Sequence, residues 1–235
     1  MENKDFLYFR INEVNEFYNR SIEEIRRLDS VTMKKILILS MIDSLAQEYS
    51  NYGKNNQGNF INFLNTFSNY NYWNKIDVVT LYYSEKEIFE KNNIKMNFIR
   101  SSRMFKVSEI VELAKNKGIE KFIQDTIDIK TIDKHRYANL LFKYRSKLVH
   151  EFAPPTAQPK LNENDDEPVY LKMVELKLNE ETNTTYIDDY GSELCFTYKF
   201  LENIFVETLD NYLKYCIKNE IDPFKNKKNY RTWYE

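Results

Sequence analysis

Residues 135–152 have the sequence HRYANLLFKYRSKLVHEF and contain both histidines of the chain. Apolar residues recur in this stretch at helical spacing, and Pro154-Pro155 follow it, so we predict an amphipathic helix that ends before the prolines. We call it the Arg–His helix, because Arg145 and His150 lie near its end. Arginine offers planar donors suited to phosphate oxygens, and histidine is the side chain best suited to exchange protons near neutral pH. This helix is the candidate functional element.

The composition of the whole chain favours a helical protein. Its 235 residues include four glycines and five prolines, which indicates long regular elements rather than a turn-rich β-sandwich. Aromatic residues make up 15%, so burial energy is ample. The net charge is −2, and a chain without a basic excess binds RNA or DNA only through a local positive patch.

The apolar runs argue against a membrane protein. Residues 1–5 are mostly charged and lead into no apolar signal region, and the longest apolar run, 36–42, is far shorter than the roughly 20 residues of a spanning helix. We expect a cytoplasmic protein with no membrane partner. The sequence contains no glycine-rich phosphate loop and no cysteine pair at metal-ligand spacing, so we expect no metal and no cofactor.

Helical periodicity continues on the N-terminal side of this stretch. Asp29 or Ser30 is predicted to cap the most apolar helix of the chain, and Thr131 or Asp133 to cap the Arg–His helix. A break is expected at Gly118. The predicted helices before residue 131 cover residues 10–29, 31–52, 60–67, 75–92 and 106–127.

The composition changes after the prolines. Two segments rich in β-formers flank a turn signal and predict one small β-hairpin at about residues 167–188. A last long helix is expected from Ser192 to about residue 219. Cys195 and Cys216 would then lie on one helix about 30 Å apart, beyond the reach of a disulfide.

We therefore expect an all-α fold, a helical bundle with a small β-hairpin insertion before the last long helix. Residues 1–222 form a single domain in this interpretation, and residues 223–235 form a basic and aromatic tail. The tail either grips RNA through its cations and stacking aromatics, or docks its aromatic side chains on the bundle.

On an ideal helix Arg145 and His150 do not share a face. At 100° per residue they point about 140° apart, and His150 instead shares a polar stripe with Asn139, Lys143 and Ser146. Two arrangements would bring the arginine and the histidine to one phosphate. Either the helix loosens before the prolines, or two copies of the helix face each other across a two-fold axis.

Residues 131–155 resemble the signature of HEPN domains, with an arginine (Arg145), a polar residue (Ser146) and, after a few residues, a histidine (His150) near a helix end. The resemblance implies an HEPN-like bundle and a homodimer with both signature helices lining one cleft. It also implies metal-independent RNA cleavage by the RNA's own 2′-hydroxyl. His150 would be the general base or acid, Arg145 would stabilise charge on the phosphorane, and Ser146 would orient phosphate or imidazole. We therefore favour the dimeric arrangement.

One acidic side chain is expected to support this site. Asp43 is the only charge in a polar stripe that runs along the apolar helix 31–52. A cation on an apolar face needs a partner, so we predict that Asp43 approaches Arg145 or His150. Alternatively, Asp43 marks the solvent side of a surface helix.

The polar stripe of the Arg–His helix supplies the remaining candidates. Asn139 is predicted to support the site, and Lys143 and Lys147 are predicted to bind RNA. His135 lies on the same stripe about 22 Å before His150, so both cannot serve one phosphate in a single chain. We interpret His135 as a surface residue near the helix start.

Two functions are left open. The first is a metal-independent endoribonuclease, expected by analogy to be a toxin or anti-phage defence effector with an antitoxin or other regulatory protein as partner. The alternative is a catalytically inactive HEPN-like helical module that binds RNA, a nucleotide or a partner protein.

Overall fold

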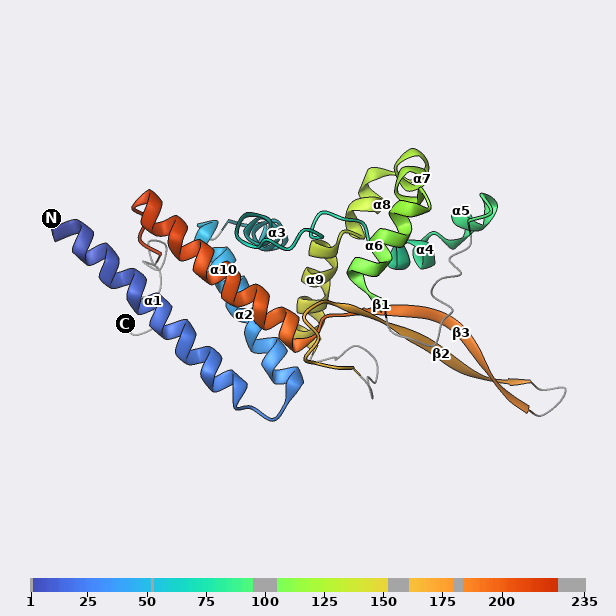
Figure 1. Ribbon diagram of the computed structural model, residues 1–235, viewed down its shortest axis with the longest axis horizontal. Helices are drawn as coiled ribbons and strands as arrows, with labels where there is room; N and C mark the ends of the chain where they lie inside the picture. Colours follow the sequence, from blue (N-terminus) through green and yellow to red (C-terminus); the bar gives the residue numbers. More distant parts are fainter. Residues whose placement is uncertain (1, 52, 95–104, 152–160, 180–183, 224–235) are drawn as a thin grey trace.

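The computed structural model describes residues 2–51, 53–94, 105–151, 161–179 and 184–223. These residues form a mostly helical molecule with one small antiparallel sheet, which extends to one side of the helices (Figure 1). Pro154-Pro155 and nearly all of the predicted tail, from residue 224 on, lie outside the described residues.

The longest helices pack side by side and enclose most of the core (Figure 1). The helix α2 (Val31–Tyr49) lies among α1 (Glu2–Arg26), α3 (Asn56–Phe67) and α10 (Tyr198–Asn219). Its side chains Ile38, Leu39 and Ile42 are fully buried, as expected for the most apolar run of the chain. The Ser30 hydroxyl accepts a hydrogen bond from the Met33 amide, which confirms Ser30 as the N-cap of α2.

Shorter helices fill the region between α3 and the sheet (Figure 1). The predicted break at Gly118 is confirmed, because this glycine separates two helices and has a positive φ of 68°. The prediction that Thr131 or Asp133 caps the Arg–His helix was wrong, because both lie inside a separate short helix, residues 129–134, which Asp128 caps. The short helices are α4 (Val78–Ser84), α5 (Lys86–Lys91), α6 (Val107–Asn116), α7 (Ile119–Thr126) and α8 (Ile129–Lys134).

The sheet is larger than the predicted hairpin. Strands β2 (Val169–Asn179) and β3 (Thr184–Cys195) pair antiparallel, and the short strand β1 (Phe105–Lys106) pairs with the other side of β2. Tyr170 lies opposite Leu194 at the buried base of the hairpin. The described residues are mostly helical, as expected. The sheet differs from the expected single hairpin, because β1 adds a third strand.

The start of the last helix differs from the prediction. Ser192 and Cys195 belong to β3, and α10 begins after Thr197, whose hydroxyl accepts a hydrogen bond from the Phe200 amide. The strand continues because residues 192–195 are paired with the start of β2. The expectation that Cys195 and Cys216 share one helix was wrong, although both thiols are free and buried.

Candidate functional site

The Arg–His helix begins later than predicted. The helix α9 (Tyr137–Ser146) has Arg136 as its N-cap, and His135 is the C-cap of the preceding helix α8, which ends at Lys134. The chain turns here because the amides of Tyr137 and Ala138 donate to the carbonyls of Lys75 and Trp73. His135 therefore lies outside α9, and the prediction of one continuous stripe from His135 to His150 was wrong.

Beyond Ser146 the helix changes from α to π geometry. The π-helical turn η2 (Lys147–Glu151) carries His150, and Leu148 within it remains 1% exposed. A π-helical turn contains more residues than an α-helical turn, so residues i and i+5 point in more similar directions than they do in an α-helix. Arg145 and His150 have this spacing. The loosened helix thus brings them to one side within a single chain, and no second copy is needed for their contact.

The arginine is held between two partners. Arg145 Nη1 lies 3.2 Å from His150 Nε2, and Arg145 Nη2 donates to Asp43 Oδ2 at 2.5 Å. The predicted approach of Asp43 to Arg145 is confirmed. A guanidinium can only donate, so Nε2 of His150 is the acceptor in this contact.

The three side chains differ in their exposure to solvent. The side chains of Arg145 and Asp43 are only 14% and 18% exposed, whereas His150 is exposed. Arg145 Nε is buried and has no hydrogen-bond partner within the described part of the chain. The guanidinium carbon also lies 5.9 Å from the centre of the Phe142 ring, which favours a cation over its face. The site is thus a shielded cation beside an accessible imidazole.

A chain of amides links Asp43 to the following helix. Gln47 Nε2 donates to Asp43 Oδ1 at 3.5 Å, and Gln47 Oε1 accepts from Asn59 Nδ2 at 2.9 Å. Asn59 also donates to the carbonyl of Gly53. Gln47 follows Asp43 by one helical turn, so the sequence pattern could indicate it, but Asn59 comes from α3 and only the fold brings it near. This chain orients the carboxylate that orients Arg145.

The other predicted supporting residues do not contact the Arg145–His150 pair. Asn139 donates to the carbonyl of Asp133 at 2.7 Å and accepts from Gln57 at 2.6 Å, so it fastens the start of α9 to α8 and α3. Ser146 is the last residue of α9 and is half-buried. Asn139 is therefore a structural residue in this arrangement.

Lysines cluster along the same helix. Lys143 and Lys147 are exposed, and Lys143 Nζ donates to the carbonyl of Lys134 at 3.2 Å. Partial burial lowers the pKa of Lys143, and repulsion by Lys134 and Lys147 lowers it further. Lys134 was not among the predicted site residues, because it lies on α8 and only the turn at residue 136 places it near α9.

His135 has a structural environment. Its Nδ1 lies 3.0 Å from the Thr80 hydroxyl, and its carbonyl accepts from the Asp77 amide at 2.7 Å. Burial lowers the pKa of His135, and the nearby Lys143 adds to this effect. The half-buried imidazole fastens α8 to α4, which differs from the surface position expected for it.

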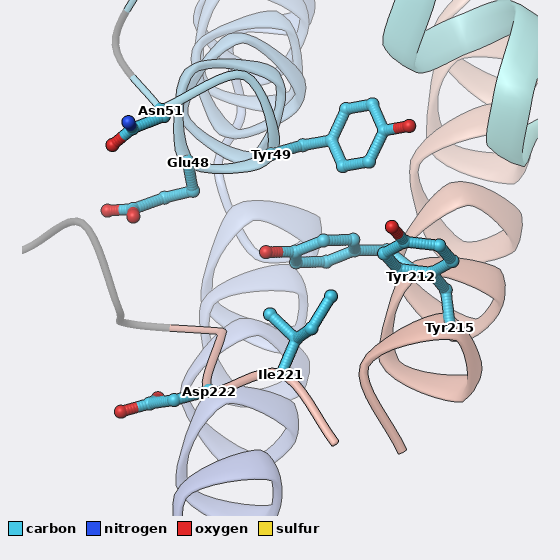
Figure 2. A pocket seen from close by; sticks show the side chains of 7 residues that line it. All are labelled: Glu48, Tyr49, Asn51, Tyr212, Tyr215, Ile221 and Asp222. Atoms are coloured by element: carbon cyan, nitrogen blue, oxygen red, sulfur yellow. The ribbon is translucent and has the colours of Figure 1, made fainter. Parts of the chain in front are cut away.

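A hollow lies at the C-terminal end of α2. It has a volume of about 200 Å³ and is formed where α2, α10 and the residues after α10 meet (Figure 2). None of its lining residues is a predicted site residue. They are Glu48, Tyr49, Asn51, Tyr212, Tyr215, Ile221 and Asp222.

Within the described ranges, no group of three or more histidine, cysteine or acidic side chains is placed to hold a metal ion. None of the described helices combines the length and apolar composition needed to cross a bilayer. No protein-family model matches the chain, and no curated protein or solved structure matches it.

Proposed function

We propose that this protein is a metal-independent endoribonuclease of the HEPN type. The observation that supports it most is the 3.2 Å contact between Arg145 Nη1 and His150 Nε2 on a π-helical turn. An exposed imidazole beside a guanidinium combines a side chain that can accept a proton with a donor for phosphate oxygens. π-Helical turns are also rare and occur frequently at functional sites.

The chemistry follows from the two side chains. His150 Nε2 removes the proton from the 2′-hydroxyl of the RNA, and the 2′-oxygen forms a bond to the adjacent phosphorus. Arg145 donates to the phosphorane oxygens, where negative charge builds up. The bond from phosphorus to the 5′-oxygen then breaks, and the imidazolium returns the proton to that oxygen. The products are a 2′,3′-cyclic phosphate and a 5′-hydroxyl, and no water or metal is consumed.

Asp43 has a positioning role in this scheme. Its carboxylate holds Nη2 of Arg145, so that Nη1 is directed toward His150 and the incoming phosphate. When a phosphate oxygen replaces Nε2 as the acceptor from Nη1, the imidazole lone pair becomes available for the 2′-hydroxyl. The ion pair thus keeps the guanidinium in place without blocking the base.

The lysine cluster fits the phosphates that flank the cleaved linkage. Lys143 and Lys147 are exposed on α9 and its continuation, and Lys134 lies beside Lys143. From residue 143 to residue 150 a helix rises about 10 Å, which is the scale of one to two nucleotides of a single strand. A local positive patch of this kind is what a chain with a net charge of −2 needs to bind RNA.

A second function is a catalytically silent helical module that binds RNA, a nucleotide or a partner protein. It is favoured by the shielding of Arg145, whose side chain is only 14% exposed and whose guanidinium is already paired with Asp43. An arginine held in this way stabilises the contact between α9 and α2 whether or not RNA is cleaved.

One experiment separates the two functions. Purified protein is incubated with a fluorescent single-stranded RNA in EDTA, beside the variants Arg145→Ala and His150→Ala. Matched controls are Arg27→Ala, an exposed arginine on another part of the surface, and His135→Asn, the other histidine. We expect the parent and both controls to cleave, and the two site variants to lose at least about 100-fold in rate.

The products provide an independent check. Mass spectrometry should find a 2′,3′-cyclic phosphate, and an RNA with a 2′-deoxy sugar at the cleavage position should resist cleavage. Absence of RNA cleavage by the parent and by all variants would support the binding module instead. Cleavage that survives His150→Ala, or that needs a divalent metal, would refute the proposed mechanism.

The proposed biological role is that of a toxin or anti-phage effector restrained by an antitoxin or another regulatory protein. It rests on the family resemblance alone. Toxicity of the expressed parent that is relieved by His150→Ala and retained by His135→Asn would support it.

A further inference from the structure

The outer face of α1 carries large apolar side chains into solvent. Phe6, Phe9 and Phe17 are 57%, 57% and 59% exposed, and Leu28, just after the helix, is 38% exposed. Single exposed apolar residues need no explanation, but a group of them on one element indicates an interaction surface.

At 100° per residue, Phe9 lies opposite the buried stripe of α1, whereas Phe6 and Phe17 lie on its flank, about 100° around the helix from the centre of that stripe. The core-facing residues, which recur at helical spacing, are 2–5% exposed and pack toward α10 and α2. In Figure 1 α1 forms one edge of the bundle, with α10 and α2 on its inner side. The buried residues of α1 are Ile11, Val14, Tyr18, Ile22 and Ile25.

One exposed flank of α1 has a regular order of side chains. Residues 6, 10, 13, 17, 20 and 24 follow one another in alternating steps of four and three, which keeps them on one straight stripe of the helix. Leu28 continues the stripe after a further step of four. In order, the residues of this α1 stripe are Phe6, Arg10, Glu13, Phe17, Arg20, Glu24 and Leu28.

When two copies of this stripe run in opposite directions, apolar residues face apolar residues and arginines face glutamates. In an antiparallel pair of α1 helices centred on Phe17, this residue meets Phe17 of the other copy. Glu13 then faces Arg20 of the other copy, and Arg10 faces Glu24. The apolar ends also match, because Phe6 meets Leu28. A parallel pair would instead place arginine on arginine and glutamate on glutamate, which is unfavourable.

We propose that the α1 stripe is the surface on which a second copy of this chain docks, as an antiparallel helix pair across a two-fold axis. A two-fold contact uses the same patch on both subunits, so a self-complementary stripe is what it requires. The interface lies on α1, whereas the Arg145–His150 contact is made within one chain on α9 and η2. The proposed dimer and the proposed ribonuclease activity therefore depend on different residues and can be tested independently.

The size of the stripe sets the expected strength. From residue 6 to residue 28 a helix is about 33 Å long and about 10 Å wide, so the contact lies at or below the small end of specific interfaces. Arg10 already pairs with Glu13 and approaches Asp222 within its own chain. The arginine–glutamate contacts between the two copies therefore favour the antiparallel orientation more than they increase the affinity. We expect a reversible dimer that dissociates on dilution in the micromolar range.

Charge reversal tests this surface. Arg20→Glu places glutamate opposite Glu13 of the other copy, and Glu13→Arg places arginine opposite Arg20, so each variant alone should be monomeric. An equimolar mixture of the two variants restores both opposite-charge layers and should form a heterodimer. Lys214→Glu on α10 is the control, because it reverses an exposed charge away from α1 and should leave the dimer intact.

The measurement is sedimentation equilibrium from about 1 to 200 µM, with circular dichroism to confirm that each variant is folded. A concentration-dependent dimer in the parent, loss in each single variant and recovery in the mixture support the proposal. A parent that stays monomeric throughout, or a mixture that does not recover, overturns it. A monomeric parent that sediments with phosphatidylcholine–phosphatidylglycerol vesicles would assign the face to a membrane surface and also overturn it.

Discussion

Asp77 is a buried carboxylate whose ionisation should control the stability of the fold. It caps α4, and its Oδ1 accepts from the amides of Val79 and Thr80 and from the Tyr170 hydroxyl at 2.8 Å. Tyr137 in turn donates to Tyr170 at 2.6 Å. Asp77 is 0% exposed, and its Oδ2 has no hydrogen-bond partner within the described residues. Burial therefore raises the pKa of Asp77 to about 6, although these hydrogen bonds oppose the shift.

The size of the effect follows from this shift. A pKa that rises from 3.8 to about 6 corresponds to about 3 kcal/mol, at about 1.4 kcal/mol per unit. Because the folded pKa is the higher one, the native state binds more protons than the unfolded state between these two values. The contribution of Asp77 to stability is therefore fully present below pH 3.8 and is lost as the pH rises through about 6.

Replacement by asparagine isolates this contribution. Asparagine is as good an N-cap as aspartate, and its carbonyl can accept the same three hydrogen bonds, but it cannot ionise. Relative to the parent, Asp77→Asn should therefore gain about 3 kcal/mol of unfolding free energy between pH 4 and pH 8. Urea denaturation of both proteins across this range measures the difference.

Parallel plots of unfolding free energy against pH for the two proteins would contradict this prediction. A constant difference between the parent and Asp77→Asn would mean that Asp77 has the same pKa in the folded and unfolded states. Asp128→Asn serves as the control, because Asp128 also caps a helix, but hydrogen bonds lower its pKa and it is exposed.

Three further predictions concern the site and the helix ends. Asp43→Asn leaves Arg145 partly buried without its carboxylate, so urea denaturation should show a loss of about 1–3 kcal/mol, and the rate of RNA cleavage should fall with it; if both stayed at the parent level, the positioning role would be wrong. Thr197→Ala should lower the unfolding free energy by about 1 kcal/mol through loss of the N-cap of α10, whereas Ser192→Ala should change it by less than about 0.5 kcal/mol; the reverse order would place the cap at Ser192. Lys143→Gln should raise the KM for RNA several-fold at nearly constant kcat and reduce the salt dependence of binding by about one phosphate contact; a fall in kcat alone would contradict a binding role.

Much of the helical body could be predicted from local patterns. The capping serine before α2, the apolar run within α2 and the break at Gly118 each depend on residues near in sequence, and the structure confirms them. The cap of the last helix could not be found in this way. Ser192 is as good a cap as Thr197 by itself, and only the pairing of residues 192–195 with the start of β2 excludes it.

In the candidate site, too, one contact could be predicted from the sequence and another could not. The approach of Asp43 to Arg145 could be predicted, because a single charge in an apolar stripe and a cation on an apolar face need each other. Two arrangements were predicted to bring Arg145 and His150 together, and the second copy of the helix was favoured over a loosened helix, whereas the structure joins the two residues within one chain where the helix loosens. The change to π geometry caused this difference, since the angle of an ideal α-helix separates the two residues.

The amino-acid sequence alone indicated the main helical segments and the side chains available for chemistry, because periodicity and residue type are local properties. The tertiary structure decided where those helices end and which side chains meet. The carbonyls of Trp73 and Lys75 set the start of α9, and the continued burial of Leu148 accompanies its π-helical end. Both depend on segments distant in the sequence, and no local pattern contains that information.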